Sequence, residues 1–291
     1  MRIKLVCNPA AGRGKAARNA AAAVPMLRGR GAEVDLQMTR DQQHLGEVIS
    51  ALDPSTFDRL AVLGGDGTLH HLIRDFDLAR FDLSILPSGS GDDFAAALGI
   101  PRDLRQACDV VLDGKVRQID VPTINGRRFL GVASFGFDSE VARYASTVKH
   151  LRGSLVYLWA ILRVLPQFVP KRVTIESAAG TREEELMFAV VANSPRYGGG
   201  IHIAPAARLD DQHLDLYVIQ RCSRVRLLKT LPMAYSGKHV RSSFVTAEQG
   251  KRFTIRSEQP LDIFADGEFV TTTPATVEMS SEKLRVIVPS A

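Results

Sequence analysis

The chain has 291 residues, 45% hydrophobic and 24% charged, which is long enough for two domains that each bury a core. Its formal net charge of +5 favours an anionic partner without distinguishing nucleotide, nucleic acid or membrane. Three scattered cysteines argue against a disulfide framework or a zinc site and favour a reducing cytoplasm, and the apolar runs are too short for a signal peptide or a membrane span.

Strand and helix patterns alternate through the first part of the chain. Short apolar runs rich in Ile, Leu and Val predict strands, and each is followed by a segment with helical spacing of apolar residues. We expect strands over 2–7, 33–39, 59–63, 83–86 and 116–120, and helices over 15–24, 44–52, 68–76, 95–98 and 103–112. This alternation is typical of an α/β domain with a parallel sheet.

The central motif is Gly64-Gly65-Asp66-Gly67-Thr68, which lies between a predicted buried strand and a predicted helix. Its glycines let backbone amides converge, and the following helix N-terminus adds positive potential, so the loop can seat phosphate oxygens. A carboxylate such as Asp66 fits beside phosphates if Mg²⁺ lies between them or if it accepts a hydroxyl hydrogen bond. The alternative interpretation is a tight turn that caps a helix.

Two similar turns follow other strands, at 8–15 and 87–94. The first contains Gly12-x-Gly14-x-x-Ala17, a weak dinucleotide fingerprint that raises an NAD-dependent oxidoreductase as one hypothesis, although no hydride-transfer site follows. Asp92 and Asp93 in the second turn fit helix N-capping as well as ligand binding. Three such turns at the ends of parallel strands would lie along one sheet edge, where ligands bind in open α/β folds.

Beyond Val121 the pattern changes to mostly strands, which indicates a β-rich second domain. We expect domains over 1–122 and 123–291, with the last strand free to return to the first domain. The expected strands are 127–134, 171–177, 185–193, 213–220, 252–256, 260–265, 268–271, 276–279 and 284–288, and the expected helical segments are 138–168 and 225–236.

Taken together, these motifs resemble the diacylglycerol kinase catalytic-domain family, in particular its soluble bacterial members. Asn8-Pro9-x-x-Gly12, Gly64 to Thr68 and Pro87-x-Gly89-Ser90-x-Asp92-Asp93-Phe94 are similar to family motifs of the first domain. Further motifs are similar in the same order: Ser134 to Asp138, Gly199-Gly200, Ala204-Pro205-x-Ala207, Asp210-Asp211 and Asp266-Gly267-Glu268.

The resemblance implies a two-domain kinase: an α/β domain like that of NAD kinase and phosphofructokinase, a C-terminal β-sandwich, and an active site in the interdomain cleft. It implies ATP binding by Asn8, Thr39, Gly64, Gly65, Asp66, Gly67, Thr68, Gly89 and Ser90, and an acidic network near Mg²⁺ made by Asp66, Asp93 and Asp120. It places the general base on the pair Asp266 and Glu268. Asp266-Gly267 between two predicted strands is also a hairpin-turn signal, and that is the competing interpretation. A structural Mg²⁺ would use the Asp211 side chain and the carbonyls of Arg208 and His213.

Three residues depart from the family pattern. Ser90 replaces the usual Thr and keeps a hydroxyl, whereas Asp92 replaces the usual Asn and adds a negative charge beside the phosphate edge. Gln212 stands where Gly is common, so the structural metal site is in doubt if that turn needs a conformation that glycine favours.

The function expected from the resemblance is ATP- and Mg²⁺-dependent phosphorylation of a lipid hydroxyl, with a diacylglycerol-like acceptor favoured. Ceramide or another sphingoid lipid is the alternative acceptor. NAD kinase, which shares Gly-Gly-Asp-Gly, and a non-catalytic nucleotide or lipid sensor are the alternative functions. The oligomeric state is open, with a homodimer as one option, and no nucleic-acid motif accompanies the basic charge.

A cytoplasmic enzyme of this kind must associate peripherally with a membrane. Residues 141–172 and 217–247 contain no Asp or Glu and several Lys and Arg, which suits anionic lipid. Within 150–170 the leucines 151, 155, 158, 162 and 165 follow helical spacing next to Trp159, as in an interfacial helix. An ordinary core helix is the competing interpretation.

Overall fold

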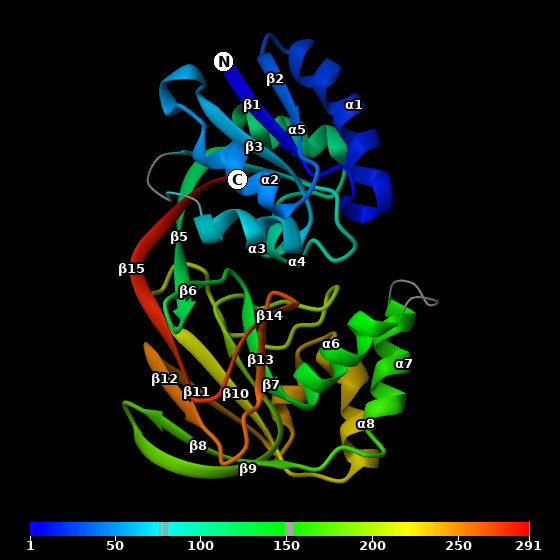
Figure 1. The fold of residues 1–291 in the computed structure, drawn as a ribbon, viewed down its shortest axis with the longest axis vertical. Coiled ribbons are helices and arrows are strands. Elements are labelled where there is room, and N and C mark those ends of the chain that lie inside the picture. The colour runs from blue at the N-terminus through cyan, green and yellow to red at the C-terminus, as the bar shows by residue number, and fades with distance from the viewer. Residues whose placement is uncertain (76, 78–80, 149–153, 291) are drawn as a thin grey trace. The chain divides into compact units, whose positions relative to one another are not determined.

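The computed structural model describes residues 1–75, 77, 81–148 and 154–290 (Figure 1). The chain divides into two compact units, which are Met1–Val121 with Ser281–Ala291, and Pro122–Ser280. The first unit therefore contains the end of the chain as well as its beginning.

The first unit is built on a parallel sheet, as the alternating pattern predicted. Its strands β1 (Arg2–Cys7), β2 (Glu33–Met38), β3 (Arg59–Gly64) and β4 (Leu83–Pro87) are ordered β4-β3-β1-β2. Val6 is paired with Val62, and Val62 with Ile85, so the carboxyl ends of these three strands are aligned. The end of β15 (Ala275–Val288) adds to β4 in parallel at Val286, and β5 (Lys115–Ile124) pairs with β15.

Helices of the first unit bury small and branched side chains against this sheet. They are α1 (Lys15–Arg28), α2 (Gln42–Ser50), α3 (Asp66–Asp75), α4 (Asp93–Ala97) and α5 (Leu104–Asp113), with the 3₁₀ turns η1 (Ala11–Gly14) and η2 (Pro54–Thr56). Ala16, Ala20, Ala23 and Leu27 of α1 recur at helical spacing and pack with Ile3 and Leu5 of β1 and with Ala107 and Val111 of α5.

Helix boundaries differ from the sequence prediction by up to four residues, and two of these differences concern the core and the central loop. α1 continues past Val24 to Arg28, through Pro25, because Leu27 is fully buried in the core. α3 begins at Asp66 rather than Thr68, so the aspartate belongs to the first turn of the helix. The predicted end of this helix near Phe76 lies outside the described residues.

The second unit is an antiparallel sheet with the order β14-β13-β7-β9-β8-β12-β15, and β10 and β11 extend it from β9. Its strands are β6 (Arg127–Arg128), β7 (Val132–Gly136), β8 (Lys171–Ser177), β9 (Gly180–Ala192), β10 (Leu214–Gln220), β11 (Val245–Gly250), β12 (Arg252–Arg256), β13 (Asp262–Ala265), β14 (Glu268–Thr272) and the first part of β15. This confirms the predicted change from α/β to β-rich architecture.

Several strand predictions were wrong in detail, and one strand was missed. The strand expected over 127–134 is interrupted between β6 and β7, because the amides of Leu130 and Gly131 donate to the carboxylate of Asp266. The two strands expected over 276–279 and 284–288 form the single strand β15. The polar strand β11 had no apolar pattern to reveal it, and it forms by pairing with β10.

The helices of the second unit are α6 (Phe137–Thr147), α7 (Ser154–Val164) and α8 (Arg224–Ala234), followed by the 3₁₀ turn η3 (Lys238–Arg241). The predicted segment 138–168 is therefore two helices, and residues 149–153, with Leu151, lie outside the described part. Ala160 and Leu165 are buried, whereas Tyr157, Leu158, Trp159 and Leu162 are 44–52% exposed. No helix among the described residues is long and apolar enough to cross a membrane.

Candidate functional site

Three polar loops meet at the carboxyl ends of β1, β3 and β4 in the first unit. The backbone joins them directly, because Asn8 N donates to Leu63 O at 3.2 Å and Ser88 N donates to Gly64 O at 2.8 Å. The sheet edge thus brings together the segments 8–15, 64–68 and 87–93, as the order of the motifs predicted.

Glycine is required where these loops touch. A Cβ on Gly12 would lie 2.0 Å from the carbonyl oxygen of Ser88, and Gly12 also has a left-handed φ of 57°. A Cβ on Gly64 would lie 2.6 Å from the Cβ of Thr68. The glycines therefore permit close packing between the loops in addition to leaving backbone amides uncovered.

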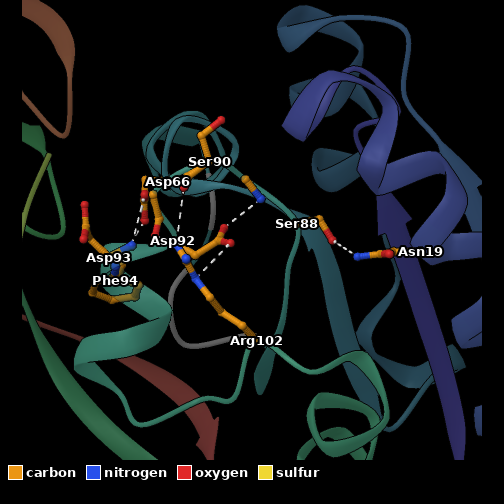
Figure 2. A network of polar contacts seen from close by, with 10 residues as sticks. Asn19, Asp66, Ser88, Ser90, Asp92, Asp93, Phe94 and Arg102 are labelled. Atoms are coloured by element: carbon orange, nitrogen blue, oxygen red, sulfur yellow. Dashed lines mark hydrogen bonds and ion pairs between the residues drawn. The ribbon is translucent and has the colours of Figure 1, made fainter. Parts of the chain in front are cut away.

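Side chains of the predicted nucleotide site hold the same loops. Asn8 Nδ2 donates to Thr68 Oγ1 at 3.2 Å, and Asn8 Oδ1 accepts from Ala10 N at 3.1 Å. Thr39 is buried and its hydroxyl donates to Cys7 O at 3.3 Å. Asn19 of α1, which the sequence analysis did not select, donates to the hydroxyl of the buried Ser88 at 2.9 Å (Figure 2).

Asp66 connects the central loop to the next one. Its carboxylate accepts from the backbone amides of Asp93 at 3.2 Å and Phe94 at 3.1 Å, the first residues of α4 (Figure 2). Burial raises the pKa of Asp66 to about 6, the two amides oppose this shift, and the charges of Asp93 and Asp92 add to it. Asp66 therefore caps α4 from outside that helix, while its charge is electrostatically disfavoured.

The capping interpretation of Asp92 was wrong. Asp92 occupies the N-cap position of α4 with a left-handed φ of 51°, and its side chain makes no capping hydrogen bond. Its Oδ1 instead accepts from Gly89 N within the same loop, at 2.7 Å. Sequence reasoning missed the true cap because Asp66 is 27 residues away from Asp93 in the chain.

Asp120 forms an ion pair of its own with a residue outside the three loops. It is fully buried on β5 and forms an ion pair with Lys283 of β15, a residue that the sequence analysis did not select. Among the residues that the structure describes, no three His, Cys, Asp or Glu side chains are grouped to hold a metal ion. The structure thus does not assemble Asp66, Asp93 and Asp120 into a three-carboxylate metal cluster.

Asp66 and Asp93 nevertheless suit a shared cation. Mg²⁺ in kinases is commonly held by one or two carboxylates, with the phosphates supplying the other oxygens. Asp66 accepts from the backbone amide of Asp93 at 3.2 Å, so the two acidic residues lie on adjacent segments, and like charges so placed repel each other. A divalent cation between them would remove that repulsion, so these residues fit the implied metal.

In the second unit, Asp266 and Gly267 form the turn between β13 and β14. Ala265 pairs with Glu268, and the two turn residues have φ values of 52° and 87°, as a two-residue hairpin turn requires. The turn interpretation is therefore confirmed. The Asp266 carboxylate accepts from the amides of Leu130, Gly131 and Val132, at 2.9, 2.8 and 3.3 Å.

Glu268, the first residue of β14, is partly exposed. Because three backbone amides occupy the carboxylate of Asp266, the two acidic residues have different environments. Asp266 is fixed as an acceptor for the segment before β7, whereas Glu268 lies beside the turn that Asp266 holds.

The turn around Asp211 is also ordered by its own side chain. Asp211 Oδ1 accepts from His213 N at 3.0 Å, and Gln212 has a left-handed φ of 63°. The turn thus requires the conformation that glycine favours, as the departure at Gln212 indicated. Asp215, which the sequence analysis did not select, is buried nearby, and burial and the charge of Asp211 raise its pKa.

Comparison with known proteins identifies the family. Residues 2–124 match the profile of the Diacylglycerol kinase catalytic domain, and residues 131–288 match the YegS C-terminal NAD kinase beta sandwich-like domain. A protein of Mycobacterium tuberculosis named diacylglycerol kinase is 31% identical over 99% of this chain and 95% of its own length. The chain belongs to the diacylglycerol kinase family.

Other members of this family match this chain over nearly its whole length. The diacylglycerol kinase of Bacillus subtilis is 27% identical over 99% of this chain and 96% of its own length. A solved structure from Bacillus anthracis covers 99% of this chain and 95% of that one, with a TM-score of 0.84 and 24% identity, which shows the shared fold. Family membership confirms the α/β domain, the sandwich-like C-terminal domain and the assignment as a lipid kinase.

Proposed function

We propose that this lipid kinase transfers the γ-phosphate of ATP to a hydroxyl of diacylglycerol or a similar neutral lipid, with Mg²⁺. The observation that carries the nucleotide assignment is the junction of three glycine-rich loops at one sheet edge, with Asp66 linking two of them. The names of the relatives support the acceptor.

Nucleotide binding is assigned to the first unit. Backbone amides of the loop around Gly65 and the hydroxyls of Thr68 and Ser90 are the expected donors to the phosphates. Asp66 and Asp93 would hold Mg²⁺, which when bound neutralises phosphate charge. No Lys or Arg lies in the 64–68 loop, so additional positive charge is assigned to Arg13 and Lys15 of the neighbouring loop.

Proton transfer is assigned to Glu268. The lipid hydroxyl oxygen forms a bond to the γ-phosphorus, the bond to the β–γ bridging oxygen breaks and leaves ADP, and the hydroxyl proton passes to the Glu268 carboxylate. Asp266 is the positioning residue, because its carboxylate is occupied by the amides of residues 130–132 and holds the hairpin that carries Glu268.

Docking on a membrane is assigned to the exposed side of α7. Tyr157, Leu158, Trp159 and Leu162 present large apolar side chains there. Aromatic side chains suit the bilayer interface, and each nearby Lys or Arg gains about 1 kcal/mol from anionic lipid. The basic helix α8 also presents exposed apolar side chains, those of Val225, Leu228 and Met233.

The structural cation near Asp211 remains a proposal. Asp211 supplies one side-chain oxygen, and the buried Asp215 supplies a second carboxylate whose Oδ2 has no hydrogen-bond partner. The carbonyls of Arg208 and His213 are the other expected ligands. Hard oxygen ligands of this type suit Mg²⁺ or Ca²⁺.

The function is tested by product analysis with the full chain. The protein is incubated with labelled ATP, Mg²⁺ and mixed micelles of diacylglycerol, ceramide, sphingosine and phosphatidylglycerol, with NAD⁺ in a separate tube. Label in diacylglycerol is the expected result, and label in ceramide or sphingosine would change the acceptor. Label only in NAD⁺ would replace the lipid assignment, and nucleotide binding without any product would indicate a sensor.

A further inference from the structure

Asp92 is a buried carboxylate with an incomplete set of hydrogen bonds. It is 2% exposed, its Oδ1 accepts from Gly89 N at 2.7 Å, and its Oδ2 has no hydrogen-bond partner. A buried carboxylate is costly unless a positive charge lies nearby.

Arg102 supplies that charge from outside the three loops. It precedes α5, its Nε lies 3.8 Å from Asp92 Oδ2, and its guanidinium also donates to the carbonyl oxygens of Gly91 and of Ser90, the latter at 3.3 Å. Figure 2 shows the side chain reaching across to the loop that contains Ser90 and Asp92. A planar guanidinium with several donors suits simultaneous contact with a carboxylate and two carbonyls.

The two contacts act on the same loop. Asp92 closes the loop internally by holding Gly89 N, and Arg102 holds the carbonyls of Ser90 and Gly91. Without Arg102, the Asp92 carboxylate would be buried with less compensation, and the two carbonyls would lose a donor. The loop would then reach a lower energy by opening and hydrating Asp92.

We propose that Arg102 is a positioning residue that keeps the loop 87–93 in its nucleotide-binding conformation by neutralising Asp92. The inference rests on the proposed function, because Gly89 and Ser90 are assigned there to the nucleotide. Arg102 acts through Asp92 and the loop backbone, and its contact with the nucleotide is not required.

A double-mutant cycle separates this role from direct phosphate binding. Binding of Mg²⁺ with a non-hydrolysable ATP analogue is measured for wild type, Arg102→Gln, Asp92→Asn and the double variant, by calorimetry on the full chain. Asn suits the left-handed φ of Asp92 and keeps an acceptor for Gly89 N, so the loop can close without a buried charge.

Arg102→Gln is expected to weaken binding by about tenfold when Asp92 is present, and by less than about twofold when it is added to the Asp92→Asn variant. An equal loss in both backgrounds would mean that Arg102 contacts the phosphates directly, which overturns the proposal. No loss in either background also overturns it. Arg105→Gln removes the same charge from an exposed residue of α5 and is the matched control, expected to bind like wild type.

A second measurement does not need the nucleotide. Hydrogen exchange of the backbone amides of residues 89–94 is expected to accelerate by about tenfold in Arg102→Gln and to return to the Asp92→Asn rate in the double variant. Unchanged exchange in Arg102→Gln overturns the proposal. If wild type binds no nucleotide, the proposed function fails, and the exchange rates still decide whether Arg102 orders the loop.

Discussion

Gly65 and Gly89 face each other across two loops at backbone contact distance. A Cβ on Gly65 would lie 2.7 Å from the Cα of Gly89, and a Cβ on Gly89 would lie 2.6 Å from the Cα of Gly65. Real Cβ atoms do not approach this closely, so either substitution must separate the loops. The distance between the central loop and the loop 87–93 is therefore set by two residues without side chains.

Gly65→Ala is expected to destabilise the protein by about 1–3 kcal/mol and to abolish binding of the ATP analogue, because the loops are forced apart. Denaturant unfolding and calorimetry measure the two effects. Gly99→Ala is the matched control: Gly99 has a φ of 73° but open space around it, so a stability loss of about 1 kcal/mol with normal binding is expected. Normal binding by Gly65→Ala would refute the role given to this contact.

Asp66 gives a pH dependence whose direction follows from its raised pKa of about 6, against an ordinary value of 3.8. Below pH 4 the group is protonated in folded and unfolded chains alike. Between about pH 4 and 6 the folded chain retains a proton that the unfolded chain has released. The free energy of unfolding therefore falls as pH rises through this range. Above about pH 6 the group is ionised in the folded and the unfolded chain, so its unfavourable contribution to the free energy of unfolding no longer changes with pH.

Relative to wild type, Asp66→Asn is therefore expected to become more stable by up to about 3 kcal/mol between pH 4 and pH 7, with loss of Mg²⁺-dependent transfer at all pH values. Urea unfolding at several pH values measures the first effect, and the wild-type rate of transfer should rise with pH through about 6. A difference in stability that does not change with pH would contradict the raised pKa of Asp66.

Asp266 and Glu268 are expected to respond differently to removal of charge. Glu268→Gln should lower kcat by at least about 100-fold without changing the unfolding free energy, because it removes the base. Asp266→Asn should destabilise the protein by about 1–3 kcal/mol, because one acceptor for the amides of residues 130–132 becomes a donor. If Asp266→Asn alone lost activity at full stability, the roles would be reversed.

The ion pair between Asp120 and Lys283 predicts a large effect on stability. Asp120 is fully buried, and removal of the Lys283 ammonium leaves its charge without this partner, so Lys283→Met is expected to cost about 3 kcal/mol. Adding Asp120→Asn should restore part of the loss. Additive losses in the double variant would mean that the two residues are not coupled.

The exposed residues of α7 predict binding to vesicles. The double substitution Trp159→Ala and Leu162→Ala is expected to weaken binding to vesicles that contain phosphatidylglycerol by about tenfold or more, because two large apolar side chains no longer enter the bilayer. Activity on a short-chain, water-soluble diacylglycerol should not change. Leu36→Ala on β2, at a similarly exposed apolar residue, is the control, and equal vesicle binding by all three proteins would rule out α7 as the docking surface.

The sequence predicted most of the fold because its signals are local. Apolar periodicity predicted most strands of both units, and the glycine-rich motifs identified the three loops that the sheet brings together. Asp266-Gly267 was correctly interpreted as a hairpin turn from two adjacent residues.

What the sequence did not predict depends on contacts between distant residues. The cap on α4 comes from Asp66, the counter-charge of Asp92 comes from Arg102, and Asp120 pairs with a lysine 163 residues away. The strand β11 has little apolar pattern, since its stability comes from pairing with β10. No spacing rule within one segment reveals which other segment will supply a partner.

The course of β15 has a consequence for synthesis on the ribosome. The first unit includes residues 281–290, whose strand pairs with β4 and whose Lys283 neutralises Asp120. The N-terminal α/β unit can therefore start to form early, but its sheet is complete only when residues 281–290 have emerged. A chain truncated after residue 122 would expose the edge of β4, so we expect it to aggregate unless that strand is supplied.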